Sequence, residues 1–280
     1  MQPVTAAVIG VGYLGRFHAQ KYAQLPGCQL VAVVDADPQR AASVAHELGV
    51  AHYTDYRRLL GDVDAVSIAA PTTLHHEIAR AFLHGGSHVL VEKPITVTVA
   101  EASDLIEVAE QHSRVLQVGH LERFNAALVA MQGRLHKPLF IESHRLAPYN
   151  PRGTDVNVVL DLMIHDIDII LNVLRAEVRN IQAVGTQVLS EDTDIVNARL
   201  EFSNDCVANV TASRVALKSE RKMRFFQQDA CLSVDFQKRV LTVHHKGDRE
   251  MFPGVPEIVG EDLTFDDNDA ILAEIEAFLG

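Results

Sequence analysis

The chain has 280 residues, enough for one large domain or two domains of ordinary size, and 48% of them are hydrophobic. Its net charge of −12 argues against nucleic acid or an anionic membrane surface as a partner. The sequence has no apolar run long enough to span a membrane, no signal-peptide pattern and only scattered cysteines, so we expect a cytoplasmic protein with reduced thiols. The histidines show no metal-ligand spacing, and no metal site is predicted.

The N-terminal stretch has the order strand, glycine turn and helix. An apolar run at 6–10 ends in glycine, and helical spacing follows from 17 to 25. Between them, Gly10, Gly12 and Gly15 have the spacing of the dinucleotide fingerprint, which is informative only in this context. The sequence therefore predicts a dinucleotide-binding segment at the start of the chain.

Each glycine of this turn has its own predicted role. Gly10 permits the tight turn, Gly12 leaves room for the pyrophosphate, and Gly15 lets the helix approach the strand closely. The pyrophosphate would then lie on the free N–H groups of the helix N-terminus, where Tyr13 and Leu14 are found.

An acidic residue follows the second predicted strand. That strand, at 29–34, ends in Asp35, at the distance from the glycine turn where a carboxylate binds the ribose hydroxyls. Because a carboxylate there repels a 2′-phosphate, NAD is expected as the cofactor in preference to NADP. Arg40 is the one nearby cation that could weaken this preference.

Strands and helices then alternate up to Gly119, which predicts a parallel sheet wound on both faces. Further strands are expected at 51–53, 65–70, 88–92 and 114–119, and further helices at 39–48, 75–83 and 98–112. In such sheets the ligand lies at the carboxyl ends of the strands. The residues predicted to bind the cofactor there are Pro71, Thr72, His75, Glu92 and Lys93.

The pattern changes after Gly119. A helix at 125–135, a strand at 139–146 and a loop at 147–155 precede an apolar helix at 157–172. Short strands with turns follow from 178 to 245, and an amphipathic helix covers 267–279. We therefore expect an α/β dinucleotide-binding Rossmann domain at 1–120 and an α+β domain with a mainly antiparallel sheet at 121–280.

The helix at 157–172 carries a polar stripe on a largely apolar surface. At helical spacing, Asn157, Asp161, His165, Asp168 and Asn172 share one face. An ordinary solvated face is the alternative explanation, but this stripe contains no Lys, Arg or Glu. A carboxylate one turn from an imidazole is the simplest unit for proton transfer.

Three motifs in this order resemble the Gfo/Idh/MocA oxidoreductases: the glycine fingerprint, Glu92-Lys93-Pro94 at a strand end, and Asp161-x-x-x-His165. The resemblance implies a Rossmann domain and a second domain with a large, open antiparallel sheet through which dimers or tetramers form. It also implies oxidation of a sugar or cyclitol hydroxyl with a nicotinamide cofactor. Members usually continue past such a tail helix, so the chain is expected to be shortened there or completed by a partner.

The resemblance assigns the catalytic roles. His165 is the expected base, Asp161 orients its ring, and Lys93 holds the reacting oxygen and can relay the proton. Asp168 is expected to make structural hydrogen bonds or to contact the substrate. His18 and His75 are expected mainly to pack and cap.

Two stretches, 118–125 and 144–169, resemble the branch of this family that oxidises the 3-hydroxyl of UDP-N-acetylglucosamine. In that branch the ketone is transaminated, which gives a diamino sugar for lipid A. The expected substrate-binding residues, besides the catalytic three, are Arg123, Asn125, Arg145 and Arg152, with the arginines holding the diphosphate. The alternatives are a dehydrogenase of a free sugar, inositol or UDP-uronate, and a non-catalytic NAD-binding regulator.

Overall fold

The computed structural model describes residues 3–150, 156–266 and 269–280. They form two compact units, Met1–Leu121 with Asp269–Gly280 and Glu122–Asn268, and each is described by itself. The sequence placed the tail helix in the second domain, whereas the structure places α7 (Ala270–Leu279) in the first unit. The difference arises because an amphipathic pattern predicts a buried helix face but not the partner that buries it.

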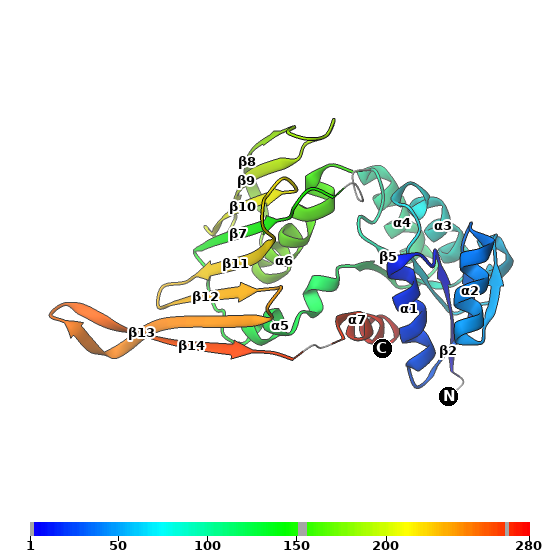
Figure 1. Cartoon of the computed structure of the whole chain (residues 1–280), viewed down its shortest axis with the longest axis horizontal. Helices are drawn as coiled ribbons and strands as arrows, with labels where there is room; N and C mark the ends of the chain where they lie inside the picture. The colour runs from blue at the N-terminus through cyan, green and yellow to red at the C-terminus, as the bar shows by residue number, and fades with distance from the viewer. Residues whose placement is uncertain (1–2, 151–155, 267–268) are drawn as a thin grey trace. The chain divides into compact units, whose positions relative to one another are not determined.

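The first unit contains a six-stranded sheet in the order β3-β2-β1-β4-β5-β6 (Figure 1). Every pair of neighbouring strands in it is parallel, which confirms the predicted doubly wound sheet. The strands are β1 (Val4–Ile9), β2 (Cys28–Val34), β3 (Ala51–Tyr53), β4 (Ala65–Ile68), β5 (His88–Glu92) and β6 (Leu116–Gly119).

Two of the helices in the first unit, α2 and α4, begin at clear side-chain caps. Asp37 accepts hydrogen bonds from two backbone N–H groups at the start of α2, and Thr98 forms a capping box with Glu101 at the start of α4. Two helices begin earlier than predicted, α1 at Tyr13 and α3 at Thr72. The helices are α1 (Tyr13–Gln24), α2 (Pro38–Leu48), α3 (Thr72–His84) and α4 (Val99–Gln111), with a short 3₁₀ helix η1 (Tyr56–Leu59).

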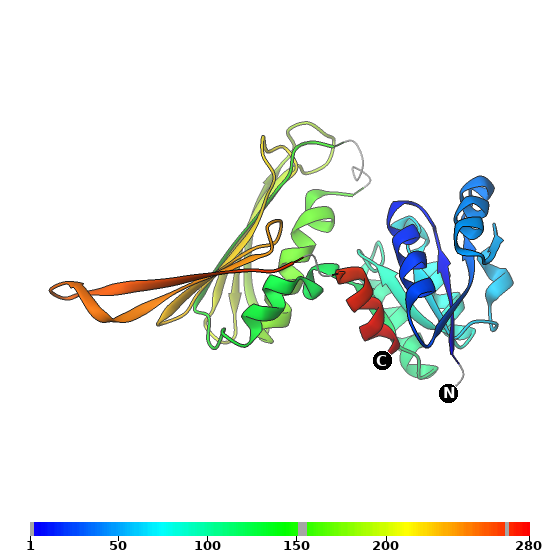
Figure 2. The ribbon, with the colours of Figure 1, turned by 60° about the horizontal axis from the view of Figure 1, so that its bottom comes forward.

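The two faces of this sheet are covered by different helices. On one face, α3 and α4 contribute Phe82 and Leu105 to a core with β4 and β5. On the other, α1, α2 and α7 pack over residues such as Leu90, and α7 supplies Ile275 and Phe278. Figure 2 shows α7, in red, lying beside α1. Because both faces of a parallel sheet must be buried, α7 completes the Rossmann fold of this unit.

The second unit contains an eight-stranded sheet in the order β14-β13-β12-β11-β7-β10-β9-β8. Its pairings are antiparallel except for β7 with β10, which confirms the predicted mainly antiparallel sheet. The strands are β7 (Phe140–Leu146), β8 (Val178–Thr186), β9 (Ile195–Phe202), β10 (Val207–Ser213), β11 (Glu220–Phe226), β12 (Ala230–Asp235), β13 (Val240–Phe252) and β14 (Val255–Thr264).

The hairpin of β13 and β14 extends past the neighbouring strands (Figures 1 and 2). The sequence predicted strands only as far as residue 245, and the added part of the hairpin is largely exposed. Its tip turns at Gly254, where φ is +78°. Since an arm of two strands buries neither face, it lacks the alternation of apolar and polar residues by which strands are predicted.

The helices of the second unit lie on one face of its sheet (Figure 2). They are η2 (Leu121–Phe124), which begins at the unit boundary, α5 (Ala126–Gln132), the π-helical turn η3 (Val159–Met163) and α6 (Ile164–Leu174). Alternate residues of β9, Val196, Ala198 and Leu200, are buried beneath them. Instead of the single regular helix predicted at 157–172, the structure has η3 followed by α6.

Two absences concern the described residues only. Cys28, Cys206 and Cys231 are free thiols and form no disulfide. Within these residues, every helix is too short or too polar to cross a membrane.

The position of α7 predicts that its apolar contacts stabilise the Rossmann unit. Replacing Phe278, which is 6% exposed, by Ala removes a buried ring from that unit's core. We expect a cost of about 3–5 kcal/mol in the free energy of unfolding, measured by urea titration. The matched control is Glu276→Ala on the exposed face of the same helix. An unchanged midpoint for Phe278→Ala contradicts this prediction.

Candidate active site

The glycine turn between β1 and α1 is tight in two places and open in one. Gly10 has φ +84°, and a Cβ there would lie 2.8 Å from the backbone of Ala69. A Cβ on Gly15 would lie 1.8 Å from the carbonyl oxygen of Gly10. A Cβ on Gly12 would meet no atom within 4 Å. Larger residues are therefore excluded at Gly10 and Gly15, while the space beside Gly12 is free for a ligand.

The N-terminus of α1 opens onto this turn. Gly12 is its N-cap, no side chain caps the helix, and its first turn contains no acidic residue. The N–H groups and the positive end of the helix dipole thus suit an anion. Tyr13, at the first position, is 83% exposed, and Leu14 is half-buried. These features fit the pyrophosphate of a dinucleotide.

A pocket of about 310 Å³ lies at the carboxyl ends of β1, β2 and β4. It brings together four predicted cofactor residues, Gly10, Gly12, Asp35 and Pro71. The sequence did not single out the other side of its lining, which includes Thr54, Tyr56, Leu74, Glu77 and Ile78. No motif marks those positions.

Tyr56 is fixed at the wall of this pocket. Its hydroxyl donates a 2.7 Å hydrogen bond to Glu77. Burial and this bond raise the pKa of Tyr56 to about 12, so the phenol remains neutral. It can therefore only act as a neutral hydrogen-bonding group or as a packing surface for a ligand.

Asp35 is 7% exposed and is held from several sides. Its carboxylate accepts hydrogen bonds of 2.9 Å from the N–H groups of Val11 and Asp37. Arg40 approaches both of its oxygens, with Nη1 at 3.2 and 3.3 Å. The carboxylate is thus held in a fixed position in the lining of the pocket.

His75 is a buried side chain that joins two backbone segments. It is 1% exposed, and its ring nitrogens lie 2.9 Å from the carbonyl oxygen of Pro94 and 2.8 Å from that of Ala70. The ring therefore joins the segments that follow β4 and β5. His75 and Thr72, the first residue of α3, do not line the pocket.

Glu92 and Lys93 stand at the end of β5 and differ in exposure. Glu92 is 9% exposed and pairs with His18 at 3.0 Å, on the side of α1. Lys93 is half-buried and is joined to Pro94 by a cis peptide bond. The structure therefore places the Glu92 side chain on the α1 side of the sheet, where it supports the position of Lys93.

In the second unit, Asp161 lies on η3 and His165 on the first turn of α6, and both are half-buried. Asn157, from the same predicted stripe, instead caps the helix by accepting hydrogen bonds from Val159 and Leu160. A π-helical turn in a helix frequently occurs at a functional site. Here it carries the predicted carboxylate.

Asp168 and Arg123 form a two-bonded ion pair. Arg123 donates through Nε at 2.7 Å and through Nη2 at 2.5 Å to the two oxygens of Asp168. Asp168 is buried, whereas the Arg123 side chain is 43% exposed. The pair fixes the guanidinium and leaves part of it accessible to a ligand.

Arg145 is placed differently from the prediction. It is 2% exposed and donates to Asp166 through Nε and Nη2, and to Glu122 through Nη1. Burial would lower the pKa of Arg145, but the charges of these two carboxylates outweigh it and raise that pKa. A diphosphate would have to displace both carboxylates, so Arg145 serves the core of this unit.

The remaining predicted substrate residues also differ. Asn125 caps α5 by accepting a hydrogen bond from the N–H of Ala127 and donates to the carbonyl oxygen of Phe236. It is therefore committed to local structure. Arg152 lies outside the described residues.

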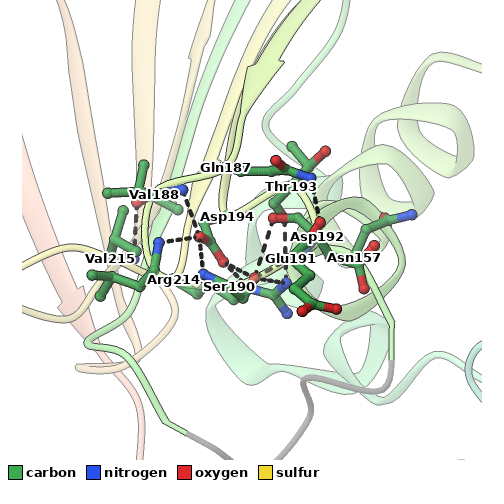
Figure 3. A network of polar contacts seen from close by, with 12 residues as sticks. Asn157, Gln187, Val188, Ser190, Glu191, Asp192, Thr193, Asp194, Arg214 and Val215 are labelled. Carbon is green, nitrogen blue, oxygen red and sulfur yellow. Dashed lines mark hydrogen bonds and ion pairs between the residues drawn. The ribbon is translucent and has the colours of Figure 1, made fainter.

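An ion pair absent from the sequence prediction holds the chain ahead of Asp161 (Figure 3). Arg214 donates through Nε to Asp194 at 2.8 Å and through Nη1 to the carbonyl oxygen of Val156 at 2.9 Å. The N–H of Val158 donates to Thr193 at 3.1 Å. Residues 156–158, which lead into η3, are thereby tied to Arg214, directly after β10, and to the loop between β8 and β9.

Asp194 is completely buried and richly hydrogen-bonded. Burial alone would raise its pKa, but bonds from the Ser190 hydroxyl and from three backbone N–H groups outweigh it and hold the pKa of Asp194 well below its usual range. The charge on this carboxylate therefore persists at any ordinary pH, and the network of Figure 3 persists with it.

Two family models match the chain. One, the Gfo/Idh/MocA oxidoreductase family with an NAD-binding Rossmann fold, matches residues 4–120. The other, the Gfo/Idh/MocA C-terminal domain, matches residues 127–233.

The relatives that match by sequence include two named dehydrogenases. UDP-N-acetylglucosamine 3-dehydrogenase of Acidithiobacillus ferrooxidans is 42% identical over 273 residues, which are 97% of this chain and 86% of that protein. The scyllo-inositol 2-dehydrogenase (NAD(+)) of Bacillus subtilis is 30% identical over 233 residues, 76% of this chain and 68% of that protein.

Solved structures agree. That of the A. ferrooxidans UDP-N-acetylglucosamine 3-dehydrogenase has a TM-score of 0.91 at 40% identity, covering 100% of this chain and 88% of its own. That of scyllo-inositol dehydrogenase from Lactobacillus casei, with bound NAD(H) and scyllo-inositol, has a TM-score of 0.78 at 21% identity, covering 99% and 88%, and shows the fold alone. The predicted cofactor, NAD, and the predicted enzyme class are confirmed, and the chain belongs to the Gfo/Idh/MocA oxidoreductase family.

Proposed function

We propose that this oxidoreductase oxidises the 3-hydroxyl of UDP-N-acetylglucosamine with NAD⁺. The single observation that carries the proposal is the 42% identity, over 97% of the chain, to an enzyme with that name. The inositol dehydrogenase relative matches less of the chain at lower identity, so inositol is the runner-up.

The first unit offers the groups that hold the cofactor. The pyrophosphate binds beside Gly12 at the N-terminus of α1, and the ribose hydroxyls bind to Asp35. When bound, NAD⁺ supplies the acceptor for the hydride that leaves the sugar carbon. Pro71 and Tyr56 line the same pocket and exclude water from the adenosine half.

The proton of the sugar hydroxyl requires a base. In the proposal His165 takes it, because an imidazole titrates near ~6.5 in the absence of perturbation. Asp161, one turn earlier, orients the ring and stabilises the imidazolium. Lys93 donates a hydrogen bond to the reacting oxygen and stabilises the negative charge that develops there.

The nucleotide must be bound by cations, since the chain has a net charge of −12. Arg123 is partly exposed and is fixed by Asp168, and we assign it to the diphosphate. Arg152 is assigned to the same group on the sequence alone. Binding energy from the nucleotide then positions the sugar ring for reaction.

The product of this reaction, a 3-ketosugar nucleotide, is suited to transamination. Alcohol oxidation by NAD⁺ is usually unfavourable near neutral pH, so removal of the ketone by an aminotransferase draws the reaction forward. We assign the resulting diamino sugar to lipid A synthesis in the cytoplasm. We also propose that copies of the chain pair through the sheet of the second unit.

The substrate assignment predicts turnover only of the nucleotide-linked sugar. We expect NADH, read at 340 nm, and a diamino sugar nucleotide, read by mass spectrometry, when UDP-N-acetylglucosamine, glutamate and a sugar-nucleotide aminotransferase are supplied together. Free N-acetylglucosamine, which lacks the diphosphate, is the matched control and should react far more slowly. Turnover of an inositol or a free sugar, with none of UDP-N-acetylglucosamine, would promote the runner-up.

The position of Asp35 predicts that NAD(H) binds more tightly than NADP(H). Losing a hydrogen bond to a charged group costs about 1.5–3 kcal/mol, so Asp35→Ala should weaken NAD(H) binding roughly 10- to 100-fold. Arg40→Ala, which removes the cation beside Asp35, should leave the order of affinities unchanged. Fluorescence titration measures both constants, and equal or tighter NADP(H) binding by the natural chain refutes the preference.

The proton-transfer assignment predicts the effects of two substitutions. Lys93→Ala and His165→Ala should each lower kcat by roughly 10²–10⁴-fold, because each removes a group that acts in the transition state. Binding of NAD(H) should remain for His165→Ala, which lies in the other unit from the cofactor. His144→Ala, at a half-buried histidine of β7, serves as the control. A variant that keeps a third of the natural rate removes that residue from the mechanism.

A further inference from the structure

Three titratable side chains meet inside the first unit, away from its cofactor pocket. They are His18 on α1, Glu92 at the end of β5 and Glu274 on α7, and they are 1%, 9% and 0% exposed. His18 Nε2 lies 3.0 Å from Glu92 Oε1. One ligand atom from each of the three lies within 4.8 Å of the others. The proposed function uses none of them.

The groups that face this cluster come from every element around it. His18 Nδ1 lies 3.2 Å from the hydroxyl oxygen of Ser67 on β4. The hydroxyl of Tyr22 lies 2.9 Å from that serine oxygen. Gln117 on β6 donates to the backbone carbonyl of Glu274. Burial, together with the nearby charges of Cys28 and Glu274, keeps the pKa of Tyr22 well above its usual range, so its phenol is neutral.

Two buried carboxylates this close together repel each other strongly unless a positive charge lies between them. His18 is the basic side chain of the cluster, with Nε2 3.0 Å from Glu92 Oε1 and Nδ1 3.2 Å from the Ser67 hydroxyl. The three residues therefore act as one unit, in which the charge of each depends on the other two.

Glu92 connects this unit to the proposed chemistry. Its carboxylate packs on the backbone of β6, where a Cβ on Gly119 would lie 2.8 Å from Oε1. Lys93 follows Glu92 directly, and the carbonyl oxygen of Pro94, one residue further on, is held by His75 at 2.9 Å. The backbone is thus fixed on both sides of Lys93, and the cluster is one of the two supports.

Anchoring of α7 does not explain the buried carboxylate. Ile275 and Phe278 already insert into the core, and Asp269 pairs with Lys21 at 2.5 Å at the start of the helix. An apolar side chain at position 274 would anchor the helix without the cost of burying a charge. The buried carboxyl group of Glu274 therefore has another use.

We propose that Glu274 is a positioning residue: through His18 it fixes Glu92, and so holds Lys93 in the orientation that the reaction requires. This inference rests on the role assigned to Lys93 in the proposed function. It gives α7, which is remote in sequence from Lys93, a part in the proposed reaction.

The test compares Glu274→Gln, which keeps the shape of the side chain and removes its charge, with Glu276→Gln on the exposed face of α7. We expect Glu274→Gln to lower kcat about 10-fold, less than the 10²-fold that a misplacement near 1 Å can cause. KM and the dissociation constant of NAD(H) should change less than about twofold, because the substitution removes no contact that binds the substrate or the cofactor in the ground state. Glu276→Gln should match the natural chain.

A comparison of thermal stability with kcat separates positioning from helix anchoring. A Glu274→Gln variant that is less heat-stable but has the natural kcat would show that Glu274 only anchors the helix.

A second readout does not depend on the sugar. Acetic anhydride labelling of Lys93, followed by peptide mass spectrometry, should change in rate for Glu274→Gln and not for Glu276→Gln. If the natural chain oxidises no sugar nucleotide, the proposed function fails, while this labelling still decides the positioning role. Equal labelling in all three proteins overturns it.

Two further outcomes are decisive. If Glu274→Gln does not fold, Glu274→Asp, which keeps the charge on a shorter side chain, is measured in the same way, and natural values of kcat and labelling contradict the proposal. Metal analysis of the purified chain should find no stoichiometric divalent ion. One bound ion per chain, lost in Glu274→Gln, would make the cluster a metal site and overturn the proposal.

Discussion

A charge inside a protein is tolerated only where its surroundings compensate it, and this constraint fixes the geometry around each proposed reacting residue. Glu92, which lies 3.0 Å from His18 Nε2, directly precedes Lys93. Asp166, compensated by Arg145, directly follows His165. The ion-pair network of Figure 3 holds the chain ahead of the π-helical turn. A buried ion pair adds little net stability, but it has few acceptable geometries. The neighbours of the reacting side chains are therefore more strictly placed than apolar packing alone would require.

The sequence predicted most of the fold because the signals involved are local. Alternation of apolar strands with helices, and the glycine turn after β1, depend on nearest neighbours in the chain. The assignment of α7 depended instead on a contact with α1 that is remote in sequence, and the pattern of α7 shows only which of its faces is apolar. The outer part of β13 and β14 escaped prediction because neither of its faces is buried. The π-helical turn was missed since one extra residue hardly alters the apolar periodicity.

The residues of the candidate site also fall into those set by local signals and those set by contacts remote in sequence. The roles of Gly10, Gly12 and Gly15 follow from backbone geometry and could be predicted, because no other part of the chain decides them. The roles of the arginines could not, since an arginine near a cleft and an arginine inside a core look alike in sequence. Arg145 is distinguished by its place on the buried side of β7, with Ile141 and Ser143, and by its partner Asp166. The partner becomes informative only once the fold is known.

The membership of α7 in the Rossmann unit has a consequence for synthesis of the chain. A ribosome releases residues in order, and domains generally fold as units as they emerge. The strands of the first unit are made early, but the helix that covers β5 on the side of α1 is made only after the whole second unit. Until then, Leu90 and its apolar neighbours lack part of their cover. The second unit, made in one continuous stretch, can complete its fold before the nucleotide-binding unit receives α7.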